Sequence, residues 1–343
     1  KNINFPKVVK MKIITIEEHF AIKEVTEISG KNLSKTISKD ESSGKSDDES
    51  NPSREELEDI AELRIQYMDE SGIDMQVISY GSNNPQELSR EASLELVIKA
   101  NDVLAASIKK NPTRLAGLAS LPVVSPKDAV NELERAVKGL GMKGAEITGM
   151  GYQGVTFDDS FFLPIFEKAA ELNVPVYMHP SVINKNIADY YYKSAQWPDS
   201  VNEILSTSGY GWHIDSGILI IRMILSGIFD RIPNLSLISG HWGEFVPYYL
   251  ERLDEKFKPS VTNLEQHFSE YYLKHIYITP GGMFSIPQLN FALDQMGVDH
   301  ILYSGDYPYA KDTKTREFLE NAPISDESKE KIGHINAEKL LGL

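Results

Sequence analysis

The sequence predicts a mixed α/β protein that folds as a closed (β/α)8 barrel, a TIM barrel, with long loops after some strands. Short apolar runs rich in β-branched residues alternate with amphipathic helical patterns, and eight such runs occur within the 343 residues. An open, doubly wound sheet is the alternative, but no Gly-x-Gly-x-x-Gly turn follows any of these runs. Eight strands over this length therefore favour the barrel.

Each predicted strand is one of the apolar runs, and helices are predicted between them. Ser53, with Glu56 three residues later, has the pattern of a capping box, and Ser125-Pro126 fits an N-cap followed by the first helical residue. The strands are expected at 12–17, 74–80, 115–120, 143–148, 174–179, 235–239, 275–279 and 300–304. The helices are expected at 54–72, 88–111, 126–139, 160–173, 215–229, 243–258 and 284–296.

Composition narrows the classes of function. A hydrophobic content of 41% over 343 residues can fill the core of one large domain or of two ordinary ones, and the eight-strand pattern predicts a single barrel domain over residues 1–343. The net charge of −15 argues against a nucleic-acid or anionic membrane surface, and the absence of cysteine excludes disulfides, thiolate zinc sites and a cysteine nucleophile. No apolar run approaches a membrane span, and the start lacks the apolar region of a secretory signal, so a cytoplasmic location is expected.

Two segments interrupt the alternation. Residues 31–53 are rich in Ser, Lys, Asp and Glu, which predicts a mobile loop that is either a lid over the barrel or a solvated insertion. Residues 181–214 contain six Tyr and Trp residues, which either line a pocket for a planar ligand or pack the loop onto the barrel. Residues 1–10 are either a short arm or precede an alternative start at Met11.

Side chains of the metal-ligand type follow several predicted strands. Glu17 and His19 end the first strand two residues apart, so the alternation of strand side chains points them the same way and Glu18 the opposite way. An oxygen and a nitrogen ligand at one point suit a divalent transition metal.

His179, His241 and Asp306 follow later strands, and in a barrel all strand ends open onto one face. A single histidine is more often structural, but four strand ends with such groups together indicate a site. The remaining histidines share no such placement and are assigned structural roles, with His213 a weak exception because it lies in the aromatic segment.

His241 has a different expected role. If residues 243–258 form one helix, Glu244 and Arg252 share a face with His241. A carboxylate beside an imidazole orients the ring and raises its basicity, which predicts an acid–base pair. Arg252 could hold that carboxylate or reach a substrate anion, and a surface ion pair between Glu244 and Arg252 is the alternative.

Six stretches together carry a family resemblance: EEHFAI (17–22), MDESGIDMQVIS (68–79), RLAGLASLPVVSPKDAVNELERAV (114–137), VPVYMHP (174–180), LSLISGHWGE (235–244) and ILYSGDYPY (301–309). They resemble the metal-dependent amidohydrolase superfamily, in its amidohydrolase 2 branch. Within it they are most similar to the nonoxidative aromatic-acid decarboxylases, such as those of γ-resorcylate and 2,3-dihydroxybenzoate. The segments 31–53 and 181–214 depart from the family, so the resemblance supports the reaction class better than the compound.

The resemblance implies the roles of individual residues. It implies one Mn²⁺ or Zn²⁺ ion, no organic cofactor, a small aromatic acid as substrate and a homo-dimer or homo-tetramer. Asp306 would also be the proton donor to carbon, His241, Glu244 and Arg252 would be catalytic, and His241, Trp212 and Arg252 would contact the substrate. The implied metal ligands are Glu17, His19, His179 and Asp306.

Two other classes of function stay open on the sequence. The same ligands could serve a hydrolase of a C–C bond, lactone or amide, in which metal-activated water is the nucleophile. A catalytically inactive barrel used for binding is disfavoured because every ligand-type position is filled.

Overall fold

The computed structural model describes residues 11–25, 27–28, 52–81 and 84–343, so the predicted loop lies outside the described residues except for its last two positions. Its parallel strands confirm the mixed α/β prediction. One sheet has the order β1-β2-β3 and a second has the order β10-β9-β8-β5-β4. The strands are β1 (Ile14–Phe20), β2 (Met75–Tyr80), β3 (Leu115–Gly117), β4 (Ala119–Ser120), β5 (Ala145–Thr148), β8 (Val176–His179), β9 (Leu237–Ser239) and β10 (Ile276–Ile278).

Backbone hydrogen bonds join the two sheets into a closed barrel. β3 and β4 are successive parts of one extended segment, and between them Leu118 N–H donates to Ile78 O at 2.9 Å. On the other side, the segment 300–304 bonds to both neighbours. Leu302 N–H donates to Ile278 O at 2.8 Å, and Ile16 N–H donates to Tyr303 O at 2.8 Å. The described residues therefore provide the eight expected strand positions, as in a TIM barrel.

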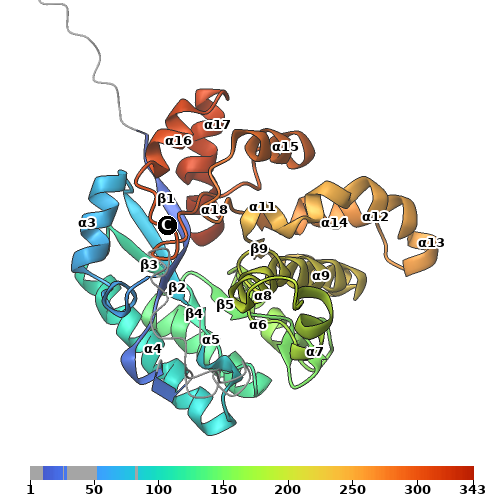
Figure 1. Cartoon of the computed structure of the whole chain (residues 1–343), viewed down its shortest axis with the longest axis horizontal. Helices are drawn as coiled ribbons and strands as arrows, with labels where there is room; N and C mark the ends of the chain where they lie inside the picture. The colour runs from blue at the N-terminus through green and yellow to red at the C-terminus, as the bar shows by residue number, and fades with distance from the viewer. Residues whose placement is uncertain (1–10, 26, 29–51, 82–83) are drawn as a thin grey trace, which may run out of the picture.

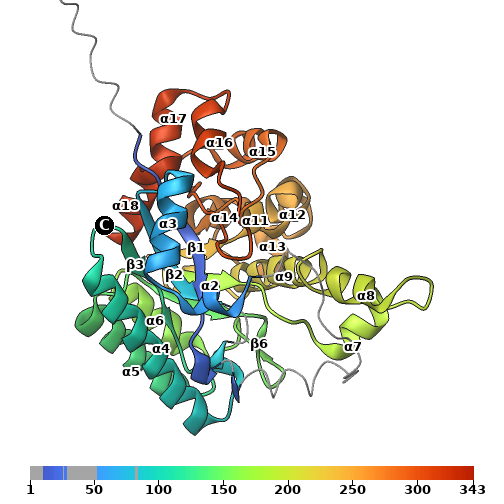
Figure 2. The same ribbon diagram turned by 60° about the vertical axis from the view of Figure 1, so that its left-hand side comes forward.

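Helices surround the strands (Figures 1 and 2). Three predicted helices are wrong in extent: 54–72 is divided at Asp59, 243–258 is not one helix, and 215–229 is divided at Gly227, whose φ is 72°. The helices are α2 (Arg54–Glu58), α3 (Glu62–Ser71), α4 (Arg90–Lys110), α5 (Pro126–Leu140), α6 (Leu163–Glu171), α7 (Lys185–Ile187), α8 (Asp199–Ser206), α9 (Gly211–Leu225), α10 (Ile228–Arg231), α11 (His241–Glu244), α12 (Leu250–Lys256), α13 (Pro259–Thr262), α14 (Phe268–His275), α15 (Ile286–Met296), α16 (Thr315–Asn321), α17 (Asp326–Glu330) and α18 (Asn336–Leu341).

Local capping explains the division of 54–72. The capping box is confirmed, because Glu56 N–H donates to Ser53 Oγ at 3.2 Å and Ser53 N–H donates to Glu56 Oε2 at 2.7 Å. Asp59 then ends α2, and its Oδ1 accepts from the N–H groups of Ala61 and Leu63 at 2.9 and 3.1 Å. The Asp59 side chain therefore satisfies the free amides at the start of α3.

Two further features concern the outside of the barrel. α7 and α8 lie on an arm that extends beyond the barrel wall (Figure 2), and β6 (Gly151–Tyr152) pairs with β7 (Val155–Thr156) in a small antiparallel ribbon. None of the described helices is both long enough and apolar enough to cross a membrane.

Close packing between barrel strands gives a stability prediction. A Cβ on Gly144 would lie 2.5 Å from Pro175 O, so Gly144→Ala forces the backbones of β5 and β8 apart. We expect a loss of about 1–3 kcal/mol in the free energy of unfolding, measured by urea denaturation. Gly139→Ala is the matched control, because a Cβ there meets nothing within 4 Å in α5 and should stabilise by about 0.5–1 kcal/mol. Equal stability of the two variants would contradict the prediction.

Candidate metal centre and active site

The four predicted metal ligands converge at the carboxyl ends of the strands. His19 Nε2 lies 3.4 Å from Asp306 Oδ1, and His179 Nε2 lies 4.0 Å from Glu17 Oε1. The His19 and His179 rings meet edge to face, with centroids 4.8 Å apart. Segments separated by nearly 300 residues therefore place two carboxyl groups and two imidazoles around one point.

A bulge in β1 aims Glu17 at this point. Ile16 pairs with Val77 and Glu18 with Ile78, so Glu17 is an extra residue in the ladder, with φ of 78°. Alternation puts Glu17 and His19 on one face and Glu18 on the other, and the bulge makes the face of Glu17 the same as that of Ile16. The predicted orientation of these three side chains is confirmed, and the bulge also puts Ile16 on the face of His19.

The ligand atoms have the chemistry that a divalent metal requires. Thr279 Oγ1 donates to Glu17 Oε2 at 2.6 Å, but Glu17 Oε1 and His19 Nε2 are buried and, within the described residues, have no hydrogen-bond partner. Leaving such an atom unsatisfied costs about 1–3 kcal/mol. Burial lowers the pKa of His19 to about 4 and that of His179 to about 3, so both imidazoles are neutral and offer lone pairs. The residues present fit one divalent transition metal.

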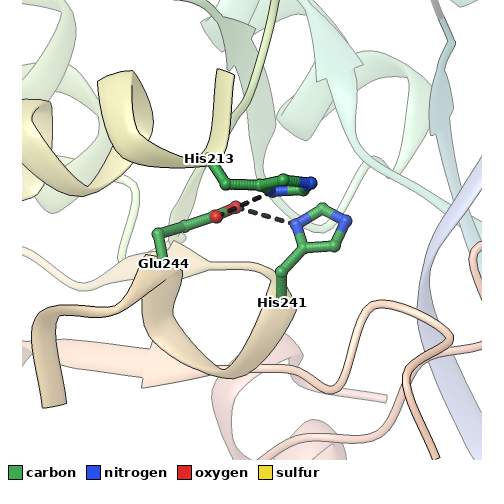
Figure 3. Close-up of side chains that lie close together, drawn as sticks. All are labelled: His213, His241 and Glu244. Carbon is green, nitrogen blue, oxygen red and sulfur yellow. Dashed lines mark hydrogen bonds and ion pairs between the residues drawn. The ribbon is translucent and has the colours of Figure 1, made fainter. Parts of the chain in front are cut away.

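A carboxylate that bridges two imidazoles lies beside this centre (Figure 3). His241 Nδ1 is 2.7 Å from Glu244 Oε1, and His213 Nδ1 is 2.9 Å from Glu244 Oε2. His241 Nε2 points to the metal centre, 3.4 Å from Glu17 Oε1. Burial alone lowers the pKa of His241, but the carboxylates of Glu17 and Glu244 outweigh it and raise the pKa to about 10. The His241 imidazole thus lies between Glu17 and Glu244, and the Glu244 carboxylate orients its ring.

His213, His241 and Glu244 also bring their ligand atoms within 4.8 Å of one another, as a metal site would. However, both imidazole Nδ1 atoms are already hydrogen-bonded to the carboxylate. Among the predicted ligands, Glu17 Oε1 and His19 Nε2 are the atoms that lack a hydrogen-bond partner within the described residues. The strand ends therefore remain the candidate metal centre, and His213, His241 and Glu244 form a hydrogen-bonded group beside it.

Comparison with known proteins identifies the family. The sequence profile of the amidohydrolase family matches residues 19–343. The chain is 31% identical to γ-resorcylate decarboxylase of Polaromonas sp. over 341 residues, which cover 96% of this chain and 98% of that protein. The chain belongs to the amidohydrolase family.

Solved structures of this family have the same fold. A dihydroxybenzoic acid decarboxylase from Polaromonas sp., with bound manganese and 2-nitroresorcinol, is 29% identical, with 97% of each chain covered and a TM-score of 0.83. A 5-carboxyvanillate decarboxylase from Novosphingobium aromaticivorans, in complex with manganese and 4-hydroxy-3-methoxy-5-nitrobenzoic acid, is also 29% identical. The superposition covers 97% of this chain and 96% of that protein, with a TM-score of 0.88. The predicted resemblance to aromatic-acid decarboxylases is confirmed.

The expected helix that joins His241 to Arg252 is wrong. Residues 241–245 all have positive φ, so α11 is a tight turn and α12 starts only at Leu250. His241 and Glu244 meet through this turn rather than along a helix face. Arg252 is exposed on α12 and pairs with Glu255 at 3.0 Å. The structure gives Arg252 no contact with the site of its own chain.

The aromatic segment 181–214 is divided between surface and site. Tyr190 and Tyr191 are 82% and 69% exposed, so they do not line a pocket in this chain. His213 Nε2 lies 3.1 Å from Trp212 Nε1 and 3.0 Å from Ser208 O, and His213 Nδ1 lies 2.9 Å from Glu244 Oε2. The sequence indicated only weakly that His213 belongs to the site. His213 lies at the start of α9, which follows another helix rather than a strand.

Removing one ligand should release the metal. In His19→Ala the site loses a nitrogen ligand, so affinity for added Mn²⁺ or Zn²⁺ should fall by more than the roughly 10–100-fold that loss of an outer partner costs. Metal content after dialysis measures this. His300→Ala is the control, since His300 stacks on Tyr277 away from the site and should keep its metal. Full metal content in His19→Ala would exclude His19 as a ligand.

Proposed function

We propose that this amidohydrolase is a metal-dependent, nonoxidative decarboxylase of a hydroxylated aromatic acid. The observation that carries the proposal is the pair of buried ligand atoms, Glu17 Oε1 and His19 Nε2, left unsatisfied beside Asp306 and the oriented imidazole of His241. The decarboxylases similar to this chain over nearly its whole length support the same reaction. No observation favours the hydrolase alternative.

The proposed metal ligands are Glu17, His19, His179 and Asp306. When bound, the ion supplies Lewis-acid polarisation of the phenolic and carboxylate oxygens of the substrate. We assign Mn²⁺ rather than Zn²⁺, because manganese is bound in the two decarboxylases compared above.

The protein groups handle the proton. Asp306 donates a proton to the ring carbon that bears the carboxylate, the bond to the carboxylate breaks, and its electron pair remains on the ring as CO2 leaves. Water then restores the proton on Asp306. His241, held by Glu244, stabilises charge on the phenolic oxygen, and His213 holds the other oxygen of Glu244. His241 and Trp212 are the proposed substrate contacts.

The enzyme is also proposed to be a homo-dimer or homo-tetramer in the cytoplasm. Phe245, the last residue of the left-handed turn at 241–245, is 48% exposed, and Tyr248 and Tyr249 after it are 72% and 55% exposed. Phe291 lies beside Tyr248, with ring centroids 5.7 Å apart. Adjacent exposed aromatic rings are typical of a contact between subunits.

Decarboxylation and hydrolysis give different products. The metal-loaded enzyme should release one CO2 per product from at least one member of a panel of dihydroxybenzoates, and mass spectrometry should find no ¹⁸O from labelled water in the aromatic product. A product that carries ¹⁸O without CO2 release would instead establish a metal-activated water as nucleophile.

His241 should affect turnover without affecting the metal. In His241→Ala, loss of the oriented imidazole should lower kcat by roughly 10²–10⁴-fold. The four proposed ligands remain, so metal content should match the unsubstituted enzyme. Loss of metal together with activity would make His241 a ligand and contradict this assignment.

A further inference from the structure

Glu18 lies between two proposed metal ligands in β1 but faces away from them, and it contacts the loop that carries Asp306. Glu18 Oε1 accepts from Gly305 N–H at 2.8 Å, and Glu18 Oε2 accepts from Tyr307 N–H at 3.0 Å. These two amides belong to the residues immediately before and after Asp306. One fully buried carboxyl group therefore holds the backbone on both sides of Asp306.

The carboxyl group of Glu18 is itself held in place. Gln76 Nε2–H donates to Glu18 Oε2 at 3.1 Å, and Arg64 Nη1–H donates to Gln76 Oε1 at 3.0 Å. Arg64 is fully buried, donates through Nη2 to His19 O, and lies 5.0 Å from the ring centroid of Tyr307. This network leaves Glu18 little freedom to move.

The Asp306 backbone needs such a support. Asp306 has φ of 60°, in the left-handed region that non-glycine residues seldom adopt. Such a conformation persists where its surroundings fix it. The neighbouring contact between His19 N–H and Tyr307 O, at 2.7 Å, ties the same loop to the strand of the metal ligands.

We propose that Glu18 is a positioning residue: it fixes the Asp306 carboxyl group against the metal centre by binding the amides of Gly305 and Tyr307. The role of Asp306 in this inference rests on the proposed function, whereas the hydrogen bonds between Glu18 and the loop are independent of that function. The charged and the neutral carboxyl group of Glu18 can both accept hydrogen bonds from the two N–H groups.

Glu18→Gln tests the proposal in the full chain with Mn²⁺ bound. Gln76 Oε1 is occupied by Arg64, so Gln76 still presents N–H, and the new amide has a single accepting oxygen for three N–H donors. At least one donor then loses its acceptor. Hydrogen exchange of the peptide that spans 302–309 should quicken roughly 10-fold. With Mn²⁺ at saturating concentration, the kcat for CO2 release should fall on the order of 10²-fold through misplacement of Asp306, with KM unchanged.

Glu132→Gln is the matched control. Glu132 is 2% exposed and accepts from Asn101 and Arg135 at 2.7 Å, on α5 away from the metal centre. Its substitution should lower thermal stability but leave kcat and exchange at 302–309 unchanged. If Glu132→Gln lowered kcat as much as Glu18→Gln, the effect would be one of general stability and the proposal would be overturned.

Gly305→Ala is a second variant in case Glu18→Gln does not fold. A Cβ on Gly305 would lie 3.0 Å from Glu18 Oε1, so it presses on the same contact without removing a polar group. It should show the same pattern with smaller changes. Unchanged exchange and kcat in a folded Glu18→Gln, or in Gly305→Ala where Glu18→Gln does not fold, would overturn the proposal. If the unsubstituted enzyme released no CO2, the proposed function would fail, while the exchange data would still decide the role of Glu18.

Discussion

Because β1 carries one extra residue at Glu17, three side chains at its carboxyl end serve two different purposes. Glu17 and His19 face the proposed metal centre, and Glu18 faces the loop that brings Asp306 to the same place. A regular strand would put Glu17 on the face opposite Ile16, away from the barrel interior. The bulge is therefore the constraint on which the arrangement of ligands depends.

The barrel also sets the electrostatics of the site. Its strands fully bury the Glu17 carboxyl group and the His19 imidazole, and such burial is costly unless a partner compensates. Glu244 is hydrogen-bonded to the imidazoles of His213 and His241. One oxygen of Glu17 accepts a hydrogen bond from the Thr279 hydroxyl. Glu17 Oε1 and His19 Nε2 have no hydrogen-bond partner within the described residues, which is why they are proposed as ligands of the ion. Neutral imidazoles and acidic oxygens in one buried place are what a divalent metal stabilises.

Sequence reasoning succeeded where a residue follows a buried strand. His179 and Asp306 follow such strands, and all strand ends of a barrel share one face, so their convergence could be inferred. Sequence reasoning failed where the position of a side chain depends on the geometry of a loop. The left-handed turn at 241–245 separates Arg252 from Glu244, and no helical period reveals such a turn. His213 reaches Glu244 from the start of α9, a position with no periodic signal.

The sequence by itself determined the fold class, the ligand types and the family, since these follow from strand spacing and from short motifs that keep their order along the chain. Only the tertiary structure decided which side chains share a partner. The bulge at Glu17, the bridge from His213 to Glu244 and the hold of Glu18 on the Asp306 loop each join segments distant in sequence. Such contacts depend on the closure of the barrel and on backbone angles of single residues, and local propensity encodes neither.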